Sequence, residues 1–201
     1  MNLPNRLTVS RIGLTMAMVV CLTCAAIPFG KTLALVVFVV AVLTDIWDGR
    51  IARTYSRVTA FGQLMDPQAD KILISAAFIA FVAVRQIVPA WIVIIIIGRE
   101  FLITGLRLLG AARGRVMAAG RWGKHKMIWQ TAVILVIMFG LTLQEDLLPC
   151  LGGRHAAAAT RTFAHYFSWV SLWLSALVAV LTVVSGAVYA WENRDLFMDD
   201  L

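Results

Sequence analysis

The segment "DIWDGRIARTYSRVTAFGQLMDPQADK", residues 45–71, places four aspartates and four cationic residues in a chain that is otherwise strongly apolar. Long apolar runs flank this segment on both sides. Ionisable residues next to membrane-spanning helices are costly, and they usually serve a function. The interpretation of this segment therefore decides both the fold and the chemistry that we expect of the chain.

The composition excludes a soluble globular domain. The 201 residues are 61% hydrophobic and 14% charged, with a mean hydropathy of +0.85, whereas charged residues make up about a quarter of soluble domains. Six stretches approach the roughly 20 apolar residues that cross a bilayer. We expect an all-α integral membrane protein, one domain over residues 1–201, with an outer loop at 144–165 and spans near 7–27, 33–52, 66–84, 88–109, 127–143 and 167–190.

The net charge of +7 favours anionic lipid and phosphorylated substrates over nucleic acid, because the basic residues are interleaved with the spans. Six spans place both termini on one side, and the basic residues on that side outnumber those on the other. By the positive-inside rule the termini and the aspartate segment face the cytoplasm. The predicted cytoplasmic side holds Arg6, Arg11, Arg50, Arg53, Arg57, Arg113, Arg115, Arg121, Lys124, Lys126 and Arg194, and the other side holds Lys31, Arg85, Arg154 and Arg161.

The four aspartates have helical spacing. If the second span continues through Arg53, then Asp45, Asp48, Gly49, Ala52 and Arg53 form one stripe of a helix, and Gly62, Asp66 and Asp70 form a stripe on the next helix. Small residues in both stripes allow the backbones to approach with room for a ligand. Pro67 either opens the third helix or bends it. We expect the two stripes to face each other across a cleft.

Four facing carboxylates repel one another in a low-dielectric setting unless cations lie among them. Hard divalent cations suit an all-oxygen cluster, and Mg²⁺ or Mn²⁺ accepts carboxylates, waters and substrate phosphates. Two such ions about 4 Å apart can stabilise both the attacking and the leaving oxygen of a phosphoryl transfer. Two alternatives remain open: solvated acids paired with neighbouring arginines, and the ion site of a cation transporter.

The pattern D-x2-D-G-x2-A-R-x8-G-x3-D-x3-D is filled at every fixed position, from Asp45 to Asp70. It resembles the signature of the CDP-alcohol phosphotransferase family. The resemblance implies a membrane enzyme of six transmembrane helices, often a homodimer, which displaces CMP from a CDP-alcohol with the hydroxyl of a second alcohol. It also implies a requirement for divalent metal, here two ions of Mg²⁺ or Mn²⁺.

The resemblance implies a role for each matching residue. Asp45, Asp48, Asp66 and Asp70 would bind the metal ions, and Asp70 would also act as the general base toward the acceptor hydroxyl. Bacterial members of the family open with an N-P-N-x-L-T sequence, similar to "NLPNRLTVSR" here. Pro4 and Asn5 also suit a helix start, and Arg6 and Arg11 are predicted at headgroup level on an interfacial segment. The implied CDP-diacylglycerol site comprises Leu3, Pro4, Asn5, Arg6, Gly49, Arg53 and Thr59.

The fourth span and the loop after it carry further charge. Arg99 and Glu100 lie within the apolar stretch, where a charge is a functional hypothesis by default. The elements "MDPQADK", "RExxxTGLR" and "GKxK" are similar to the branch of the family that joins CDP-diacylglycerol to glycerol 3-phosphate. That similarity implies an acceptor-phosphate site of Arg99, Arg107, Lys124 and Lys126. Met127 departs from the branch, where a threonine is expected.

The acceptor alcohol stays open on the sequence alone. Phosphatidylglycerol, the acceptor of a cardiolipin synthase of the same fold, and inositol phosphate or serine are the alternatives within the family. We expect the chain to act as a homodimer in a bacterial cytoplasmic membrane, with its active site facing the cytoplasm. The part after about residue 131 is predicted to be generic hydrophobic helix.

Overall fold

The computed structural model describes the backbone of residues 3–55, 60–84, 86–113 and 121–194. It describes the side chains of residues 9–45, 68–69, 71–84, 86–113, 123, 125–152 and 157–194. The described chain is helical. Its elements are α1 (Leu3–Thr23), α2 (Gly30–Tyr55), α3 (Ala60–Ala83), α4 (Ala90–Ala112), α5 (Arg121–Leu141), a π-helical segment η1 (Thr142–Leu147), α6 (Leu148–Cys150) and α7 (Gly153–Glu192).

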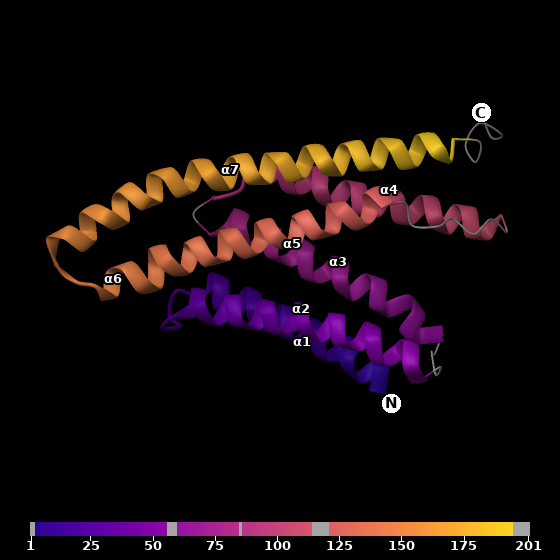
Figure 1. Cartoon of the computed structure of the whole chain (residues 1–201), viewed down its shortest axis with the longest axis horizontal. Helices are drawn as coiled ribbons and strands as arrows, with labels where there is room; N and C mark the ends of the chain where they lie inside the picture. The colour runs from indigo at the N-terminus through magenta and orange to yellow at the C-terminus, as the bar shows by residue number, and fades with distance from the viewer. Residues whose placement is uncertain (1–2, 56–59, 85, 114–120, 195–201) are drawn as a thin grey trace.

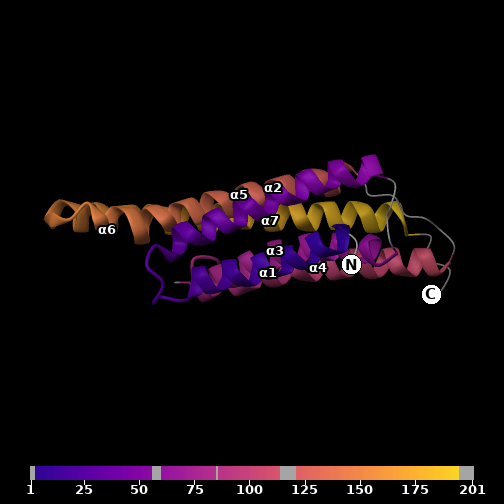
Figure 2. The ribbon, with the colours of Figure 1, turned by 90° about the horizontal axis from the view of Figure 1, so that it is seen from below.

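The helices form an elongated bundle (Figure 1). Helix α1 contacts both α2 and α3, α4 contacts α3 and α7, and α5 contacts α2, α3 and α7. Figure 2 shows α2 and α5 on one side of the bundle and α1, α3 and α4 on the other. The beginning of α1, the end of α2, the beginning of α3 and the ends of α4 and α7 share one end of the bundle, which we call the site end (Figure 1). The opposite end, with residues 24–29 and 142–152, is the distal end.

The predicted helices are present, with shifted ends. Helices α1 to α5 and α7 overlap the six expected spans. Two apolar helical stretches within the described residues, 125–150 and 157–192, are long enough to cross a membrane, and the shorter apolar stretches 9–23 and 71–83 accompany them. The all-helical class is therefore confirmed for the described chain, whereas the count of six spans stays a prediction.

The expected outer loop at 144–165 is wrong. Most of this region is helical, because η1, α6 and the first turns of α7 occupy it and Leu151 and Gly152 alone connect α6 to α7. Gly152 has a φ of 66°, a conformation that glycine adopts without the steric cost of a Cβ. The run Ala156–Ala159 follows at once, and alanine has the highest intrinsic helix propensity. The sequence therefore favours a helical hairpin here rather than a loop.

Two further expectations on helix boundaries need correction. The N-terminal segment is no separate interfacial element, because residues 3–23 form one continuous helix. The proline at position 4 lies in its first turn, where a missing N–H is tolerated. Pro67 does not open the third helix, since α3 begins seven residues earlier at Ala60.

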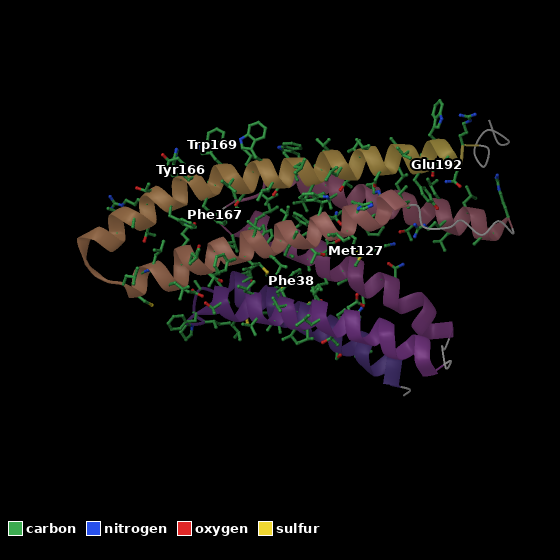
Figure 3. All side chains as sticks on the ribbon, in the orientation of Figure 1. Phe38, Met127, Tyr166, Phe167, Trp169 and Glu192 are labelled. Carbon is green, nitrogen blue, oxygen red and sulfur yellow. The ribbon has the colours of Figure 1, made fainter. Side chains whose placement is uncertain are left out.

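The core consists of apolar side chains from α1, α2, α3, α4, α5 and α7. Met18, Phe38, Phe78, Ile134 and Met138 are fully buried, and Phe38 lies between α2 and α5 (Figure 3). Large apolar side chains also cover the outside of the bundle, among them Trp91, Ile94, Phe101, Trp169 and Trp173. An apolar exterior around an apolar core is what a bilayer-embedded bundle requires.

Helices α5 and α7 approach closely at a glycine. Phe167 points from α7 toward α5, whereas its neighbours Tyr166 and Trp169 point away from the bundle (Figure 3). The Phe167 ring lies over Gly140, and a Cβ at position 140 would overlap that ring. Phe163 stacks on Phe167 with ring centroids 5.5 Å apart. This contact fixes the spacing and register of the two longest apolar helices.

Charged side chains tie α2 to η1 at the distal end. A carboxylate oxygen of Asp146 accepts hydrogen bonds from the backbone N–H of Thr32 at 2.7 Å and from its hydroxyl at 2.6 Å. Thr32 lies in the first turn of α2, so a residue 114 positions away caps this helix. Lys31 lies 3.5 Å from Glu145 and donates to the carbonyl oxygen of Leu22. The distal end is thus held by polar contacts between α1, α2 and η1.

Candidate active site

The four aspartates lie on two helices whose ends meet at the site end. Asp45 and Asp48 are in the second half of α2, and Asp66 and Asp70 are in the first half of α3 (Figure 1). Because both segments are continuous helix, the spacing expected from the sequence holds on the backbone. The side chains of Asp48, Asp66 and Asp70 lie outside the described set, so their facing arrangement stays a prediction.

Asp45 has a partner that the sequence reading missed. Its Oδ1 lies 2.8 Å from Nη2 of Arg11 on α1. The Arg11 side chain is 3% exposed and that of Asp45 is 34% exposed, so Arg11 points into the bundle, and its expected position at headgroup level stays a prediction. The register of an antiparallel helix pair gives a signal for this contact, because Arg11 and Asp45 are about equally far from the turn that joins α1 and α2.

The donor set fits a hard divalent cation. Carboxylate oxygens are the protein ligands that Mg²⁺ and Mn²⁺ take, and the partly exposed carboxylate of Asp45 faces a cation already. Among the described side chains no three His, Cys, Asp or Glu residues gather into a metal-binding group. The side chains of the other three aspartates lie outside the described set, and their helices bring their backbones to the same end of the bundle.

The residues implied in nucleotide binding also belong to the site end. Leu3, Pro4, Asn5 and Arg6 form the first turns of α1, and Gly49 and Arg53 lie on the last turns of α2. Thr59 lies outside the described residues. Since α1 packs against both α2 and α3, its beginning lies beside the helices that carry the aspartates (Figures 1 and 2).

A cluster of cations lies inside the bundle next to the aspartate helices. This basic cluster consists of Lys71 on α3, Arg99 and Arg107 on α4, and Lys126 on α5. Nζ of Lys71 donates to Oγ1 of Thr104 at 2.5 Å. The positive charges lie close enough for mutual repulsion, which links Lys71 to both arginines and Lys126 to Arg99 and Lys71. Lys71 directly follows Asp70 in the chain, so the cluster adjoins the aspartate stripe of α3.

Glu100 is the acid that contacts this cluster among the described side chains. Its Oε1 pairs with Nζ of Lys126 and lies 3.4 Å from Nη1 of Arg99. The Lys126 and Glu100 side chains are 6% and 16% exposed. Counted over the described side chains alone, four cations and one acid leave three positive charges. Buried charge of one sign requires a counter-ion, and this excess matches a small polyanionic ligand.

Helix α7 contributes two hydroxyls to the basic cluster. Nη2 of Arg99 donates to Oγ of Ser185 at 2.8 Å. Nε of Arg107 donates to the Tyr189 hydroxyl at 3.3 Å, and the guanidinium carbon lies 5.4 Å from the centre of the Tyr189 ring. The expectation that the later part of the chain is generic hydrophobic helix is therefore wrong for this face of α7.

The structure brings three of the four expected acceptor residues together. Arg99, Arg107 and Lys126 belong to the basic cluster, and Lys124 lies on α5 with its side chain outside the described set. Lys71 joins the cluster and was absent from the expected acceptor site. The signal for Lys71 was present, because it lies one residue from Asp70 on a helix that faces α4.

These observations define a helical membrane protein with carboxylates and a cationic cluster at one end of its bundle. The chain matches the CDP-alcohol phosphatidyltransferase family over residues 1–191, and it belongs to that family. The all-helical fold and the apolar exterior agree with a membrane-embedded member.

Several curated relatives cover most of the chain. A protein of Bacillus subtilis (strain 168) named CDP-diacylglycerol–glycerol-3-phosphate 3-phosphatidyltransferase is 35% identical over 96% of this chain and 95% of its own length. A protein of Rickettsia bellii with the same name is 29% identical over 94% of this chain and 93% of its own. A probable phosphatidylglycerophosphate synthase of Mycobacterium tuberculosis (strain H37Rv) is 34% identical over 83% of this chain and 68% of its own.

Proposed function

We propose that this chain transfers the phosphatidyl group of CDP-diacylglycerol to glycerol 3-phosphate, giving phosphatidylglycerol phosphate and CMP. The observation that carries the proposal is the basic cluster, in which four cations face one acid among the described side chains and Lys71 directly follows Asp70 in the chain. The names of the relatives that match nearly the whole chain support the same reaction.

The nucleotide end of CDP-diacylglycerol is bound between the beginning of α1 and the end of α2. The segment from Leu3 to Arg6 covers the nucleotide, Gly49 allows close backbone approach, and Arg53 pairs with the diphosphate. Thr59 completes this subsite. The acyl chains stay in the lipid beside the apolar exterior of the helices.

Asp45, Asp48, Asp66 and Asp70 would hold two divalent cations, Mg²⁺ or Mn²⁺. When bound, such ions neutralise the diphosphate and stabilise charge on the attacking and leaving oxygens. Arg11 holds one oxygen of Asp45 in place, which fixes the orientation of this carboxylate within the aspartate stripe of α2.

The acceptor hydroxyl attacks the phosphorus that bears diacylglycerol. A phosphorus–oxygen bond forms to the acceptor, the bond to the bridging oxygen of the diphosphate breaks, and CMP leaves with that oxygen. Asp70 takes the acceptor proton. A carboxylate beside two cations is a weak base, so proton transfer assists late, as the new bond forms. Positioning and charge neutralisation supply most of the rate.

The charge of the basic cluster selects the acceptor. A phosphate monoester carries close to two negative charges at neutral pH, and it offsets most of the three positive charges. Serine provides no phosphate, and phosphatidylglycerol provides a single charge on a diester. The arginines and lysines of the cluster also supply charge-assisted hydrogen bonds that a phosphate monoester can accept. Glycerol 3-phosphate therefore fits this cluster better than those two alternatives.

The proposal includes the location and assembly of the protein. The site end faces the cytoplasm of a bacterial cell from its inner membrane, where the water-soluble acceptor is present, and the positive-inside rule supports this orientation. The chain acts as a homodimer, as the family resemblance implies.

The test is CMP release by purified protein in detergent. CDP-diacylglycerol is supplied with glycerol 3-phosphate, phosphatidylglycerol, inositol phosphate or serine in parallel. We expect rapid CMP release with glycerol 3-phosphate, its loss on complete chelation, and its recovery with Mg²⁺ or Mn²⁺. Faster release with another acceptor would reassign the substrate, and release that survives chelation would exclude the metal-dependent mechanism.

A further inference from the structure

We infer that α7 builds one wall of the acceptor-phosphate subsite, with Ser185 and Tyr189 as positioning residues for Arg99 and Arg107. This inference rests on the proposed function and extends it to a helix outside the signature segment. Neither hydroxyl belongs to the aspartate stripes or to the charged segments that carry the resemblance to the family. Both act through an arginine rather than on a reacting atom.

Arg99 is held on α7 by two features. Its Nη2 donates to Oγ of Ser185, which is 2% exposed. Its aliphatic stem lies against Gly186, where an added Cβ would come within 3.0 Å of Cγ. These contacts leave Nε buried against α7 and without a partner among the described residues. A buried guanidinium N–H without an acceptor is costly, so the position of Arg99 is set by its contacts with α7.

Arg107 is held on the same helix by one hydroxyl and one ring. Nε donates to the Tyr189 hydroxyl at 3.3 Å, and the guanidinium lies over the ring face with its carbon 5.4 Å from the ring centre. A cation over an aromatic face within about 6 Å is attracted to the ring. These contacts use one edge and one face of the guanidinium.

The spacing of the residues along α4 and α7 allows both hydroxyl–arginine pairs to form across the same helix contact. Ser185 and Tyr189 are four residues apart, so they lie on one face of α7. Arg99 and Arg107 are eight residues apart on α4, about two turns. Helices α4 and α7 are in broad contact, and the contact aligns each arginine with one hydroxyl.

Positioning matters here because a flexible arginine loses side-chain entropy when it binds an anion. Contacts that fix the side chain before binding reduce that cost. The two guanidinium groups are held near Lys71 and Lys126, so the basic cluster has donors from three helices. The acceptor phosphate is then bound with its hydroxyl directed toward the aspartate end of α3.

The test is the steady-state kinetics of Ser185→Ala and Tyr189→Phe, with each substrate varied in turn. We expect the KM for glycerol 3-phosphate to rise about tenfold in each variant, the loss typical of one hydrogen bond to a charged group. The KM for CDP-diacylglycerol should stay unchanged. Tyr189→Leu, which removes the ring as well, should raise the acceptor KM further than Tyr189→Phe.

The matched control is Ser175→Ala. Ser175 lies on the same helix, is fully buried, and has no hydrogen-bond partner among the described residues. It should leave both KM values unchanged. If Ser185→Ala fails to fold, Ser185→Thr keeps the hydroxyl and should bind the acceptor normally. An acceptor KM that rises no more in Ser185→Ala and Tyr189→Phe than in Ser175→Ala would overturn the inference.

A second measurement separates this inference from the proposed function. Inorganic phosphate should raise the unfolding temperature of the wild-type protein, and the increase should shrink in Ser185→Ala and Tyr189→Phe but persist in Ser175→Ala. If glycerol 3-phosphate gives no turnover but this pattern holds, the proposed function is wrong and the positioning role stands. If turnover is normal and phosphate protects all variants equally, the positioning role is wrong.

Discussion

Asp70 and Lys71 are neighbours on α3 with opposite tasks in the proposed site. Asp70 belongs to the carboxylate stripe, and Lys71 belongs to the basic cluster through its contact with Thr104. Successive helical residues point about 100° apart, so one turn of α3 faces both substrates. This adjacency joins the two halves of the proposed reaction at a single position of the backbone.

Asp70→Asn should abolish turnover while CDP-diacylglycerol still binds. The amide keeps the size of the side chain but removes its negative charge and its capacity to take the acceptor proton. General base catalysis contributes about 100- to 10,000-fold, so CMP release should fall by at least about 100-fold. Retention of the nucleotide lipid is measured by equilibrium binding. Near-normal turnover in this variant would refute the assignment of the base.

Glu100→Ala should destabilise the fold, and phosphate should recover part of the loss. Lys126 would lose its acidic partner in a largely buried position, and breaking a buried ion pair costs about 3–5 kcal/mol. Thermal unfolding in detergent, with and without inorganic phosphate, measures both effects. Glu192→Ala is the control, since that acid is exposed at the end of α7 (Figure 3). An unchanged unfolding temperature in Glu100→Ala would exclude the proposed charge compensation.

At the scale of residues, the sequence predicted the positions of functional residues where these follow from spacing along one helix. The spacing of the aspartates follows from helical geometry, and the structure has continuous helix at both stripes. Arg11, Ser185 and Tyr189 were missed because their partners are 34, 86 and 82 positions away. Such pairs depend on how helices pack, which residue type and spacing along one helix do not specify.

The two longest apolar helices meet at Gly140, and Gly140→Ala should disturb their packing. The new methyl group would overlap the Phe167 ring, and overpacking of this kind costs about 1–3 kcal/mol. The unfolding temperature in detergent should fall. Gly98→Ala is the matched control, since its Cβ would meet nothing within 4 Å. Combining Gly140→Ala with Phe167→Leu should restore part of the stability. An equal fall of the unfolding temperature in Gly98→Ala would refute this explanation.

At the scale of elements, the hydropathy of the sequence predicted where the helices lie. Polar interruptions of the apolar pattern did not reliably predict where they end. The apolar runs gave each main helix with its ends shifted by several residues. Residues 144–165 were expected as a loop, and Gln144, Glu145 and Asp146 interrupt the apolar pattern there. Glu145 and Asp146 instead contact α2, since Lys31 supplies the opposite charge to Glu145 and Thr32 supplies the donors to Asp146. The polar interruption therefore marks a tertiary contact and not the end of a helix.

At the scale of the whole molecule, the exposed cysteines report the orientation in the membrane. Cys24 and Cys150 are exposed and lie at the distal end, whereas Cys21 is buried. If the site end faces the cytoplasm, a membrane-impermeant maleimide should label both exposed cysteines in intact cells. The variant Cys24→Ser/Cys150→Ser should lose this labelling. Labelling that requires permeabilised cells would reverse the proposed orientation.

The order of helices and the membrane class followed from the sequence, but the arrangement in space did not. Nothing in the hydropathy places α1 against both α2 and α3, or α7 against α4 and α5. These contacts decide that the beginning of the chain lies beside the aspartates and that the C-terminal helix reaches the arginines. Apolar helices pack closely where small residues such as Gly140 and Gly186 leave room for a side chain of the neighbouring helix. The composition of the chain does not reveal which small residues have this role.

The bonds from Asp146 to Thr32 fasten α2 at the end remote from the aspartates. In the proposed reaction the diphosphate of the donor lipid enters at the site end while its acyl chains stay in the bilayer, and a tilt of α2 that admits it would turn about the fastened distal end. Helix α2 has 26 residues, a length of about 39 Å, so a swing of about 5° moves its free end by roughly 3 Å. Such a tilt would leave the distal contacts of α2 intact and displace the helix most where the diphosphate arrives.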